Sequence, residues 1–322
     1  MLTEAVEAIL FPGFIFTVGL GFLFEWLERK VAAHMQGRVG PLVAGPHGVL
    51  QPVADFFKLL YKEEIVPEFA DITIYRIAPA LYFLAPILGM LFVPVVGTRA
   101  VATFDMDLLL VIFLLAYSAF VVVILSFASA SGYTTVASGR LVLQYVSYEI
   151  PLVIAIVTAG VFSHSLSIAG IVGAQAAAWN ILYMPFSFVV FIIALMAELE
   201  KPPFDIPSAK TEIVAGWLTE FSGRALAFLK LTKEVSLVFG AGLAVSLFLG
   251  GPLGPVPTDA VLAAVAYTAY FLAKLLVVVL LIFVLRSAMA RLRIAQAAEF
   301  FWKILTPLAL AQLAFVMILG GI

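Results

Sequence analysis

The sequence predicts an all-α polytopic membrane protein with about eight transmembrane helices in a single integral membrane domain, residues 1–322. Three observations predict this class. Of the 322 residues, 64% are hydrophobic and only 12% are charged, whereas about 25% of residues are charged in soluble domains. The apolar residues gather in runs long enough to cross a bilayer. The basic residues between these runs are divided very unequally between alternate loops, as in membrane proteins of fixed orientation.

Each apolar run contains about 18 or more residues, the length that crosses the hydrocarbon core of a membrane. We expect spans near residues 9–27, 78–97, 107–129, 141–162, 182–200, 225–250, 260–285 and 302–321. The N-terminus carries Glu4 and Glu7 and lacks the basic leader of a signal peptide, so the first run is expected to be retained. Basic residues follow the odd-numbered runs and, except for Arg99, hardly occur in the other loops. This asymmetry predicts outward-facing termini, N-out and C-out, and cytoplasmic loops after the odd-numbered helices.

Two of the expected cytoplasmic loops, about 28–77 and 200–224, are long and polar. The first contains GRVGPLVAGPHG (37–48), whose glycines and prolines predict a folded, non-helical loop. The segment that follows, 48–64, is amphipathic and predicts a short helix on the membrane surface. Its apolar face is expected to consist of Val49, Val53, Phe56, Phe57 and Leu60. The second loop includes ELEKPPFDIPSAKTE (198–212), where three prolines in six residues exclude a continuous helix.

Several classes of site are disfavoured by composition. The absence of cysteine excludes disulfides, thiolate zinc sites and cysteine-ligated iron–sulfur clusters within this chain. The three histidines, His34, His47 and His164, are scattered, so we expect no haem and no metal in this chain. A net charge of −2 without a basic patch predicts no nucleic-acid partner. The glycines of GRVGP follow no strand and precede no GKS or GKT, so a phosphate-binding loop is not expected.

Charged residues fall inside the expected spans, where each costs on the order of 3 kcal/mol. Lys274 stands near the middle of the seventh span, Glu149 about two turns into the fourth, and Glu198 and Glu200 at the end of the fifth. The sixth span carries Lys230, Lys233 and Glu234, of which Lys230 and Glu234 are spaced to pair on one helix face.

These charges have two interpretations. They are structural ion pairs and interfacial charges, or they form a relay of groups that change protonation at modest cost. We expect Lys30, Glu200 and Lys201 to be structural, because they stand at helix ends. We expect Glu149, Glu234 and Lys274 to belong to a relay. The costliest of them, Lys274, is expected to pair with Glu149 or Glu234, or else to have a strongly lowered pKa.

Four ordered motifs carry a resemblance to a known family. They are ERKVAAHMQGRVGP (28–41) with GVLQPVADFFKLLYKE (48–63), RLVLQYVSYEIPL (140–152), AELEKPPFDIP (197–207) with TEIVAGWLTEFSG (211–223), and AMARLRIAQ (288–296) with WKILTP (302–307). Together they resemble the NADH dehydrogenase subunit 1 family of complex I. The resemblance covers essentially the whole chain and agrees with the expected helices and orientation.

The resemblance implies a non-catalytic heel subunit in the cytoplasmic membrane of a prokaryote. Its expected partners are the iron–sulfur and large hydrogenase-like subunits of a redox arm, antiporter-like membrane subunits and the lipid bilayer. The iron–sulfur clusters, and a nickel–iron site in hydrogenase relatives, would then lie in those partners. The expected charge relay comprises Glu149, Glu198, Glu212, Glu220, Glu234 and Lys274. The expected docking surface for the redox arm comprises Arg29, Gln36, Arg38, Gly40, Pro41, Asp55, Lys58, Pro203, Phe204 and Asp205.

One departure from the family pattern bears on the reaction. Ser208 and Lys210 stand where the family usually carries carboxylates, which disfavours quinone reduction. We therefore expect a ferredoxin-driven complex that passes electrons to protons or polysulfide and moves protons or sodium. The alternative is the quinone-chamber component of an NADH- or F420H2-type quinone or methanophenazine oxidoreductase. Two other classes remain open, a stand-alone secondary transporter and a purely structural membrane anchor.

Overall fold

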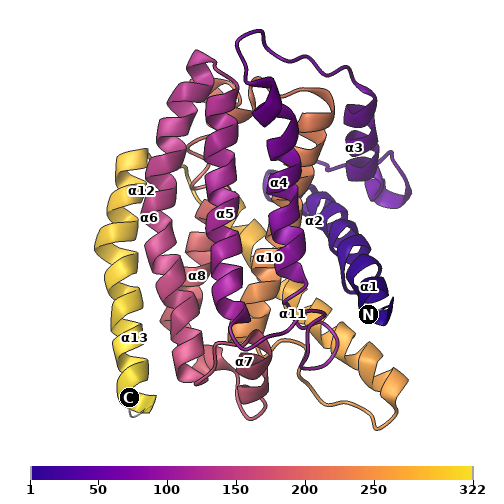
Figure 1. The fold of residues 1–322 in the computed structure, drawn as a ribbon, viewed down its shortest axis with the longest axis vertical. Coiled ribbons are helices and arrows are strands. Elements are labelled where there is room, and N and C mark those ends of the chain that lie inside the picture. Colours follow the sequence, from indigo (N-terminus) through magenta and orange to yellow (C-terminus); the bar gives the residue numbers. More distant parts are fainter. Residues whose placement is uncertain (1, 321–322) are drawn as a thin grey trace.

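Helices of very different lengths build this protein, and the computed structural model describes residues 2–320 (Figure 1). The helices are α1 (Leu2–Ile9), α2 (Phe14–Met35), α3 (Gln51–Tyr61), α4 (Ile72–Met90), α5 (Asp107–Ala128), α6 (Gly132–Phe162), α7 (Ile168–Ala174), α8 (Pro185–Glu198), α9 (Lys210–Ile213), α10 (Gly223–Phe248), α11 (Ala260–Ala288), α12 (Ile294–Phe300) and α13 (Thr306–Gly320). A π-helical turn, Phe301–Leu305, joins α12 to α13 without a break. No strand occurs in the described part of the chain.

In the described part of the chain, seven segments are long and apolar enough to cross a membrane, and they match seven of the eight expected spans. They are Val6–Met35, Ile72–Met90, Asp107–Ala128, Gly132–Phe162, Gly223–Phe248, Ala260–Ala288 and Ile294–Leu319. The eighth expected span, 182–200, is the shorter apolar helix α8 of 14 residues. The all-helical membrane fold is therefore confirmed, with one short helix among its spans.

Helix boundaries differ from the expected ones where polar residues continue a helix past its apolar part. Helix α6 begins at Gly132 rather than near 141, because a capping box at Ser131 and Thr134 starts it well before the apolar run. Helix α4 begins at Ile72 rather than near 78, since the Asp71 carboxylate accepts the amide hydrogens of Thr73 and Ile74. Hydropathy reports where the bilayer is, whereas capping side chains decide where a helix begins.

Helix α10 lies at the centre of the bundle and is buried along most of its length (Figure 1). It packs against α2, α3, α4 and α11. Close approach depends on glycine: a Cβ added at Gly89 of α4 would lie 2.4 Å from the Phe239 ring of α10. Small residues at such crossings let two backbones approach closely. Helix α10 carries Lys233 and Glu234, whose ion pairs are described below.

The bundle has two unlike ends (Figure 1). The long connection before α4 and the short α5–α6 turn lie at one end, with α3 nearby, whereas α7 and the C-terminus lie at the other. Alternate connections thus fall on opposite ends, as the sequence predicts, while the cytoplasmic side stays a prediction. Helix α11 contacts α10 and α2, and its N-terminal half leans away from the bundle.

The expected amphipathic helix is α3. The Phe56 ring packs against Phe22 of α2 at 5.6 Å and against Phe228 of α10 at 6.2 Å between ring centroids. Phe57, expected on the same apolar face, is half exposed, because α2 and α10 cover only the side that carries Phe56. The position of α3 at the membrane surface remains a prediction.

Candidate functional site

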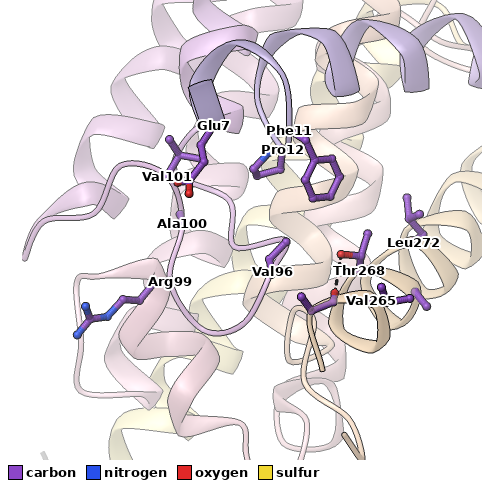
Figure 2. A pocket seen from close by; sticks show the side chains of 12 residues that line it. Glu7, Phe11, Pro12, Val96, Arg99, Ala100, Val101, Val265, Thr268 and Leu272 are labelled. Carbon is purple, nitrogen blue, oxygen red and sulfur yellow. Dashed lines mark hydrogen bonds between the residues drawn. The ribbon is translucent and has the colours of Figure 1, made fainter. Parts of the chain in front are cut away.

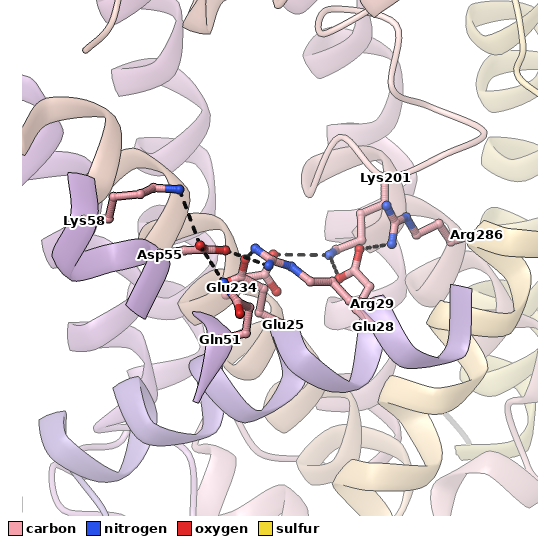
Figure 3. Close-up of polar contacts among 9 residues, drawn as sticks. All are labelled: Glu25, Glu28, Arg29, Gln51, Asp55, Lys58, Lys201, Glu234 and Arg286. Atoms are coloured by element: carbon pink, nitrogen blue, oxygen red, sulfur yellow. Dashed lines mark hydrogen bonds and ion pairs between the residues drawn. The ribbon is translucent and has the colours of Figure 1, made fainter. Parts of the chain in front are cut away.

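Lys201 lies in the loop that follows α8 and is part of a network of ion pairs with α2, α10 and α11 (Figure 3). Its ammonium group pairs with Glu28 of α2 and lies 3.7 Å from Glu234 Oε1 of α10. Arg286 at the end of α11 pairs with the same Glu28. The side chains of Lys201, Glu28 and Glu234 are only 8%, 9% and 14% exposed. Two cations and two carboxylates therefore neutralise one another inside the bundle, where an unpaired charge would be costly.

Glu200, the neighbour of Lys201, forms a second buried pair with α10. Its carboxylate accepts hydrogen bonds from Lys233 Nζ at 3.0 Å and from the Trp217 indole N–H at 2.9 Å. The Lys233 ammonium also lies 5.0 Å from the Trp217 ring centroid, a cation–π distance. Thus two adjacent residues of opposite charge on the loop pair with Lys233 and Glu234, two adjacent residues of opposite charge on α10.

Glu198 and Glu149 line one small cavity between α5, α6 and α8. The two carboxylates are close enough to interact electrostatically. Within residues 2–320, Glu198 Oε2 and the nearby Tyr148 hydroxyl have no hydrogen-bond partner. Buried polar atoms without partners are unusual, so these two groups are candidates for a functional role. Glu149 also lines a groove on the outer side of α6, beside Val146 and Ile150.

Two buried phenols lie near these carboxylates. Tyr82 and Tyr145 are within electrostatic range of both Glu198 and Glu200. The Glu198–Glu149 pair and the Glu200 ion pair therefore share a polar surrounding inside the bundle. A change in charge at one buried carboxylate alters the proton affinity of its neighbour.

Glu212 and Glu220, expected in the relay, lie outside this buried network. The exposed Glu212 pairs with Arg140 of α6, and the hydrogen bond from that guanidinium lowers the pKa of Glu212. Glu220 is partly exposed, and its backbone carbonyl accepts a hydrogen bond from the Tyr75 hydroxyl at 3.2 Å. Their part in a relay stays a prediction.

Lys274 lies apart from the carboxylates expected as its partners. Its ammonium donates hydrogen bonds of 2.9 Å to the carbonyls of Gly251 and Leu253 and lies 4.9 Å from the Trp179 ring centroid. No ion pair to Lys274 occurs among the described residues. The loop after α10 and the Trp179 ring thus take the place of the expected carboxylate, and they anchor α11 to that loop.

The expected pair of Lys230 with Glu234 is also not formed. Lys230 is exposed beside α3, whereas Glu234 turns inward to Lys201. Lys201 attracts Glu234 more strongly than Lys230 does, because Lys201 is buried and the low dielectric of the interior strengthens the attraction between charges.

Three of the expected docking residues pair with one another between α2 and α3 (Figure 3). Arg29 donates to Asp55 Oδ2 at 2.7 Å and also pairs with Glu25, while Lys58 lies 3.5 Å from Asp55 Oδ1. Partial burial alone would raise the pKa of Asp55, but hydrogen bonds from Arg29 and Gln51 outweigh it, and the pKa lies below its ordinary value. These side chains fasten α3 to α2.

The loop between α2 and α3 leaves two expected docking residues on the surface. Gln36 and Arg38 are exposed, and Arg38 Nε donates to the side-chain carbonyl of Gln36 at 2.7 Å. Gly40 packs against Lys30, and a Cβ at Gly48 would meet the Pro41 carbonyl at 2.4 Å. This part of the loop is therefore closely folded and presents polar groups outward.

Pro203 and Phe204 differ from the expectation that they form a docking surface. Both are buried, with the Phe204 ring 5.0 Å from Phe301 and the Pro203 carbonyl accepting the Leu292 N–H at 3.1 Å. Asp205 pairs with Arg291 at 3.1 Å. Apolar side chains in a loop bury themselves when a neighbouring helix offers room. These residues hold the loop against α12 and its preceding segment and leave other residues to face a partner.

Sequence reasoning assigned no relay role to Glu28, Lys201 and Arg286. Each stands near the end of an expected span, a position where charges ordinarily reach water. Lys201 and Glu28 are 173 residues apart in the chain, so no local spacing indicates their pairing. A weak signal existed in Glu25 and Glu28, two acids one helix turn apart inside the first helix. Within residues 2–320, no group of three or more acidic or histidine side chains is placed to hold a metal ion.

Comparison with known proteins gives matches over nearly the whole chain. The NADH dehydrogenase family profile matches residues 7–317. The chain is 34% identical to a subunit of the F420H2 dehydrogenase of Methanosarcina acetivorans, over 98% of this chain and 93% of that protein. It is 35% identical to a subunit of the NADH-quinone oxidoreductase of Rhizobium etli, over 92% of this chain and 88% of the relative. A chain in the solved structure of the membrane-bound sulfane sulfur reductase, an archaeal respiratory membrane complex, matches with a TM-score of 0.85 and 28% identity, covering 98% of this chain and 99% of its own.

Proposed function

Because this chain belongs to the NADH dehydrogenase subunit 1 family, we propose that it is the membrane heel of a complex I-related respiratory complex. In this role it anchors an iron–sulfur redox arm and couples electron transfer to the movement of protons or sodium. Its partners are the iron–sulfur and large hydrogenase-like subunits on one side and antiporter-like membrane subunits on the other. Its location is the cytoplasmic membrane.

One observation supports coupling rather than anchoring alone. Glu198, Glu200 and Lys201 belong to one short segment, which ends α8 and begins the loop expected to meet the redox arm. Glu198 shares a cavity with Glu149, while Glu200 and Lys201 pair with α10. A shift of this segment therefore changes the Glu198–Glu149 distance together with the distances from Glu200 and Lys201 to their partners on α10. A purely structural anchor gains nothing from a carboxylate held in an apolar interior.

The chemistry is a transfer of charge through groups of this chain. If a redox event in the arm displaces the loop, the pairing of Glu200 and Lys201 with α10 changes. The altered local charge then changes the proton affinity of Glu198, because neighbouring buried groups titrate as a coupled set. Glu149, on the outer side of α6, can pass that change to a neighbouring membrane subunit. No electron needs to enter this chain.

The test is to replace Glu198 by Gln in the intact complex and reconstitute it in sealed vesicles. Glutamine keeps the shape of the side chain and cannot become anionic. We expect an assembled complex whose redox turnover no longer drives ion uptake. Glu299→Gln is the matched control, since Glu299 is an exposed carboxylate paired with Lys303 on the surface of the same protein. Normal ion uptake by the Glu198 variant would refute the coupling role.

For the reaction, we propose ferredoxin as the electron source and protons or polysulfide as the acceptor. Ser208 and Lys210 in the loop, together with the similarity to a sulfane sulfur reductase chain, support this choice. The higher identity to subunits of F420H2 dehydrogenase and NADH-quinone oxidoreductase favours the quinone or methanophenazine alternative. Supplying the purified complex with reduced ferredoxin and assaying hydrogen, sulfide and quinol separates the two. Iron–sulfur clusters, and a nickel–iron site in the hydrogenase case, would be detected in the co-purifying subunits.

A further inference from the structure

A cavity of about 850 Å³ lies between the N-terminal segment and the leaning half of α11 (Figure 2). Its walls come from α1, the turn that carries Phe11 and Pro12, the segment 96–101 after α4, and one side of α11. Its size lies within the range of cavities that bind small organic ligands. The charge network described above does not reach it.

The cavity is amphiphilic. Figure 2 shows Glu7 and Arg99 on one side, with the Arg99 guanidinium directed outward at the edge of the cavity, and Phe11, Val265 and Leu272 on the other side. The one polar group on the α11 wall, the Thr268 hydroxyl, donates to the Ala264 carbonyl at 2.9 Å, so that wall presents an apolar surface. One cation and one anion therefore stand beside an otherwise apolar space.

The position of the cavity decides what can fill it. The segments that carry Phe11 and Val265 both belong to helices able to span a membrane. An apolar space at membrane depth is filled by hydrocarbon or by protein, because water there lacks hydrogen-bond partners. The Lys274 ammonium, bonded to Gly251 and Leu253, fixes α11 immediately after Leu272. The shape of the cavity is thus held by the fold.

The charged side chains beside the cavity indicate which kind of molecule binds in it. Arg99 is exposed beside the cavity and belongs to none of the ion pairs among the side chains that the structure describes, 6–209 and 212–319. It is also the only arginine or lysine in the segment between α4 and α5. A guanidinium is the preferred protein ligand for phosphate, and a nearby carboxylate is a natural partner for an ammonium group. An apolar protein helix would complement only the apolar wall, whereas a lipid complements the charged side with its head group and the apolar wall with its hydrocarbon chain.

We propose that this cavity binds one membrane lipid whose head group carries a phosphate and an ammonium group. The phosphate lies at Arg99, the ammonium at Glu7, and a hydrocarbon chain between Phe11, Val265 and Leu272. This inference is independent of the redox reaction and concerns how the chain is held in its bilayer.

The test measures lipid bound to the purified intact complex after washing with a mild detergent. Lipid is extracted and its phosphorus and head groups are quantified per chain. Val265→Trp narrows the cavity between Phe11 and Leu272, where the hydrocarbon chain is proposed to lie, and is expected to remove one lipid per complex. Val261→Trp is the matched control, because Val261 is exposed on the same helix and does not line the cavity. An unchanged lipid count in the Val265 variant would overturn the proposal.

The head-group assignment has its own test. Delipidated complex is incubated with equimolar vesicles of phosphatidylethanolamine and phosphatidylglycerol, and the retained lipid is analysed. The parent should prefer the ethanolamine lipid, and Glu7→Gln should abolish that preference. Arg99→Gln should retain about fivefold less of either lipid, the effect of one basic residue near a membrane surface, whereas Arg76→Gln, an exposed control, should change nothing. If Val265→Trp instead releases a membrane subunit and leaves the lipid count unchanged, the occupant is a protein helix.

Discussion

Removing the charge of Lys201 should destabilise the protein far more than removing an exposed lysine. Lys201 is the only cation paired with Glu234 in the described part of the chain, and it shares Glu28 with Arg286. Lys201→Met keeps most of the apolar length of the side chain and leaves the Glu234 carboxylate, 14% exposed, without a counter-charge. Breaking a buried ion pair on one side costs about 3–5 kcal/mol, because the remaining charge stays desolvated. Glu28 keeps Arg286 and should contribute little to the loss.

The matched control is Lys303→Met. Lys303 pairs with Glu299 at 3.2 Å, but the two side chains are 71% and 66% exposed, and exposed helix pairs contribute only about 0.3–0.5 kcal/mol. The free energy of unfolding is measured for the purified chain in mixed micelles by titration with sodium dodecyl sulfate. The second variant, Lys201→Met with Glu234→Gln, should recover about 1–3 kcal/mol of the loss, as contacting residues do in double-mutant cycles.

Two results would refute this reasoning. If Lys201→Met and Lys303→Met lower the unfolding free energy equally, then burial does not make the ion pairs of Lys201 stronger than an exposed pair. If the Glu234→Gln change adds further destabilisation to Lys201→Met, the carboxylate has another cationic partner. The first outcome would leave the Glu200–Lys233 pair as the ionic link between the loop after α8 and α10.

Four further predictions follow from single residues. Gly216→Ala should disorder the loop before α10 and release the redox arm, because Gly216 has φ +62° and a Cβ would lie 1.8 Å from the Pro207 carbonyl; Gly139→Ala, with open space around it, should bind the arm normally in a co-purification assay. Asp55→Asn should free α3 from α2, seen as a longer distance between spin labels. Because the pKa of Asp55 is depressed in the folded chain, its stabilisation is complete above about pH 4 and is lost as the pH falls through that lowered pKa. Lys274→Met should loosen the loop after α10 and leave ion pumping intact, whereas lost pumping in a folded variant would return Lys274 to the relay. A reporter at Ala44 should be cytoplasmic and reporters at both termini external; the opposite labelling would reverse the predicted orientation.

Much of the fold follows from hydrophobicity alone, since the bilayer separates apolar runs from polar connections more sharply than water separates core from surface. Seven spans, the positions of the charged loops and the short helix α3 could all be predicted in this way. The small helix α7 could not, because its seven residues contain no period or cap that distinguishes them from a loop.

The candidate site was predictable only in part. Glu149, Glu198 and Glu234 stand out because an acid within an apolar run is costly, and the structure buries all three partly. Their partners do not stand out, since Lys201 and Arg286 look like ordinary interfacial cations until the chain is folded. The partners of Lys274 were not predictable either. Because α11 leans, its middle lies beside the loop after α10, and carbonyl groups of that loop take the place of the expected carboxylate.

Helices α8 and α11 differ twofold in length. At 1.5 Å per residue, the 14 residues of α8 span about 21 Å and the 29 residues of α11 about 44 Å. A bilayer core of about 30 Å is too thick for the first and too thin for the second unless it tilts. Most side chains of α8 are buried against other helices, so protein rather than lipid surrounds this short helix. Helix α11 has few buried side chains and leans at the edge of the bundle, so a change in acyl-chain length would act on this protein mainly through the tilt of α11.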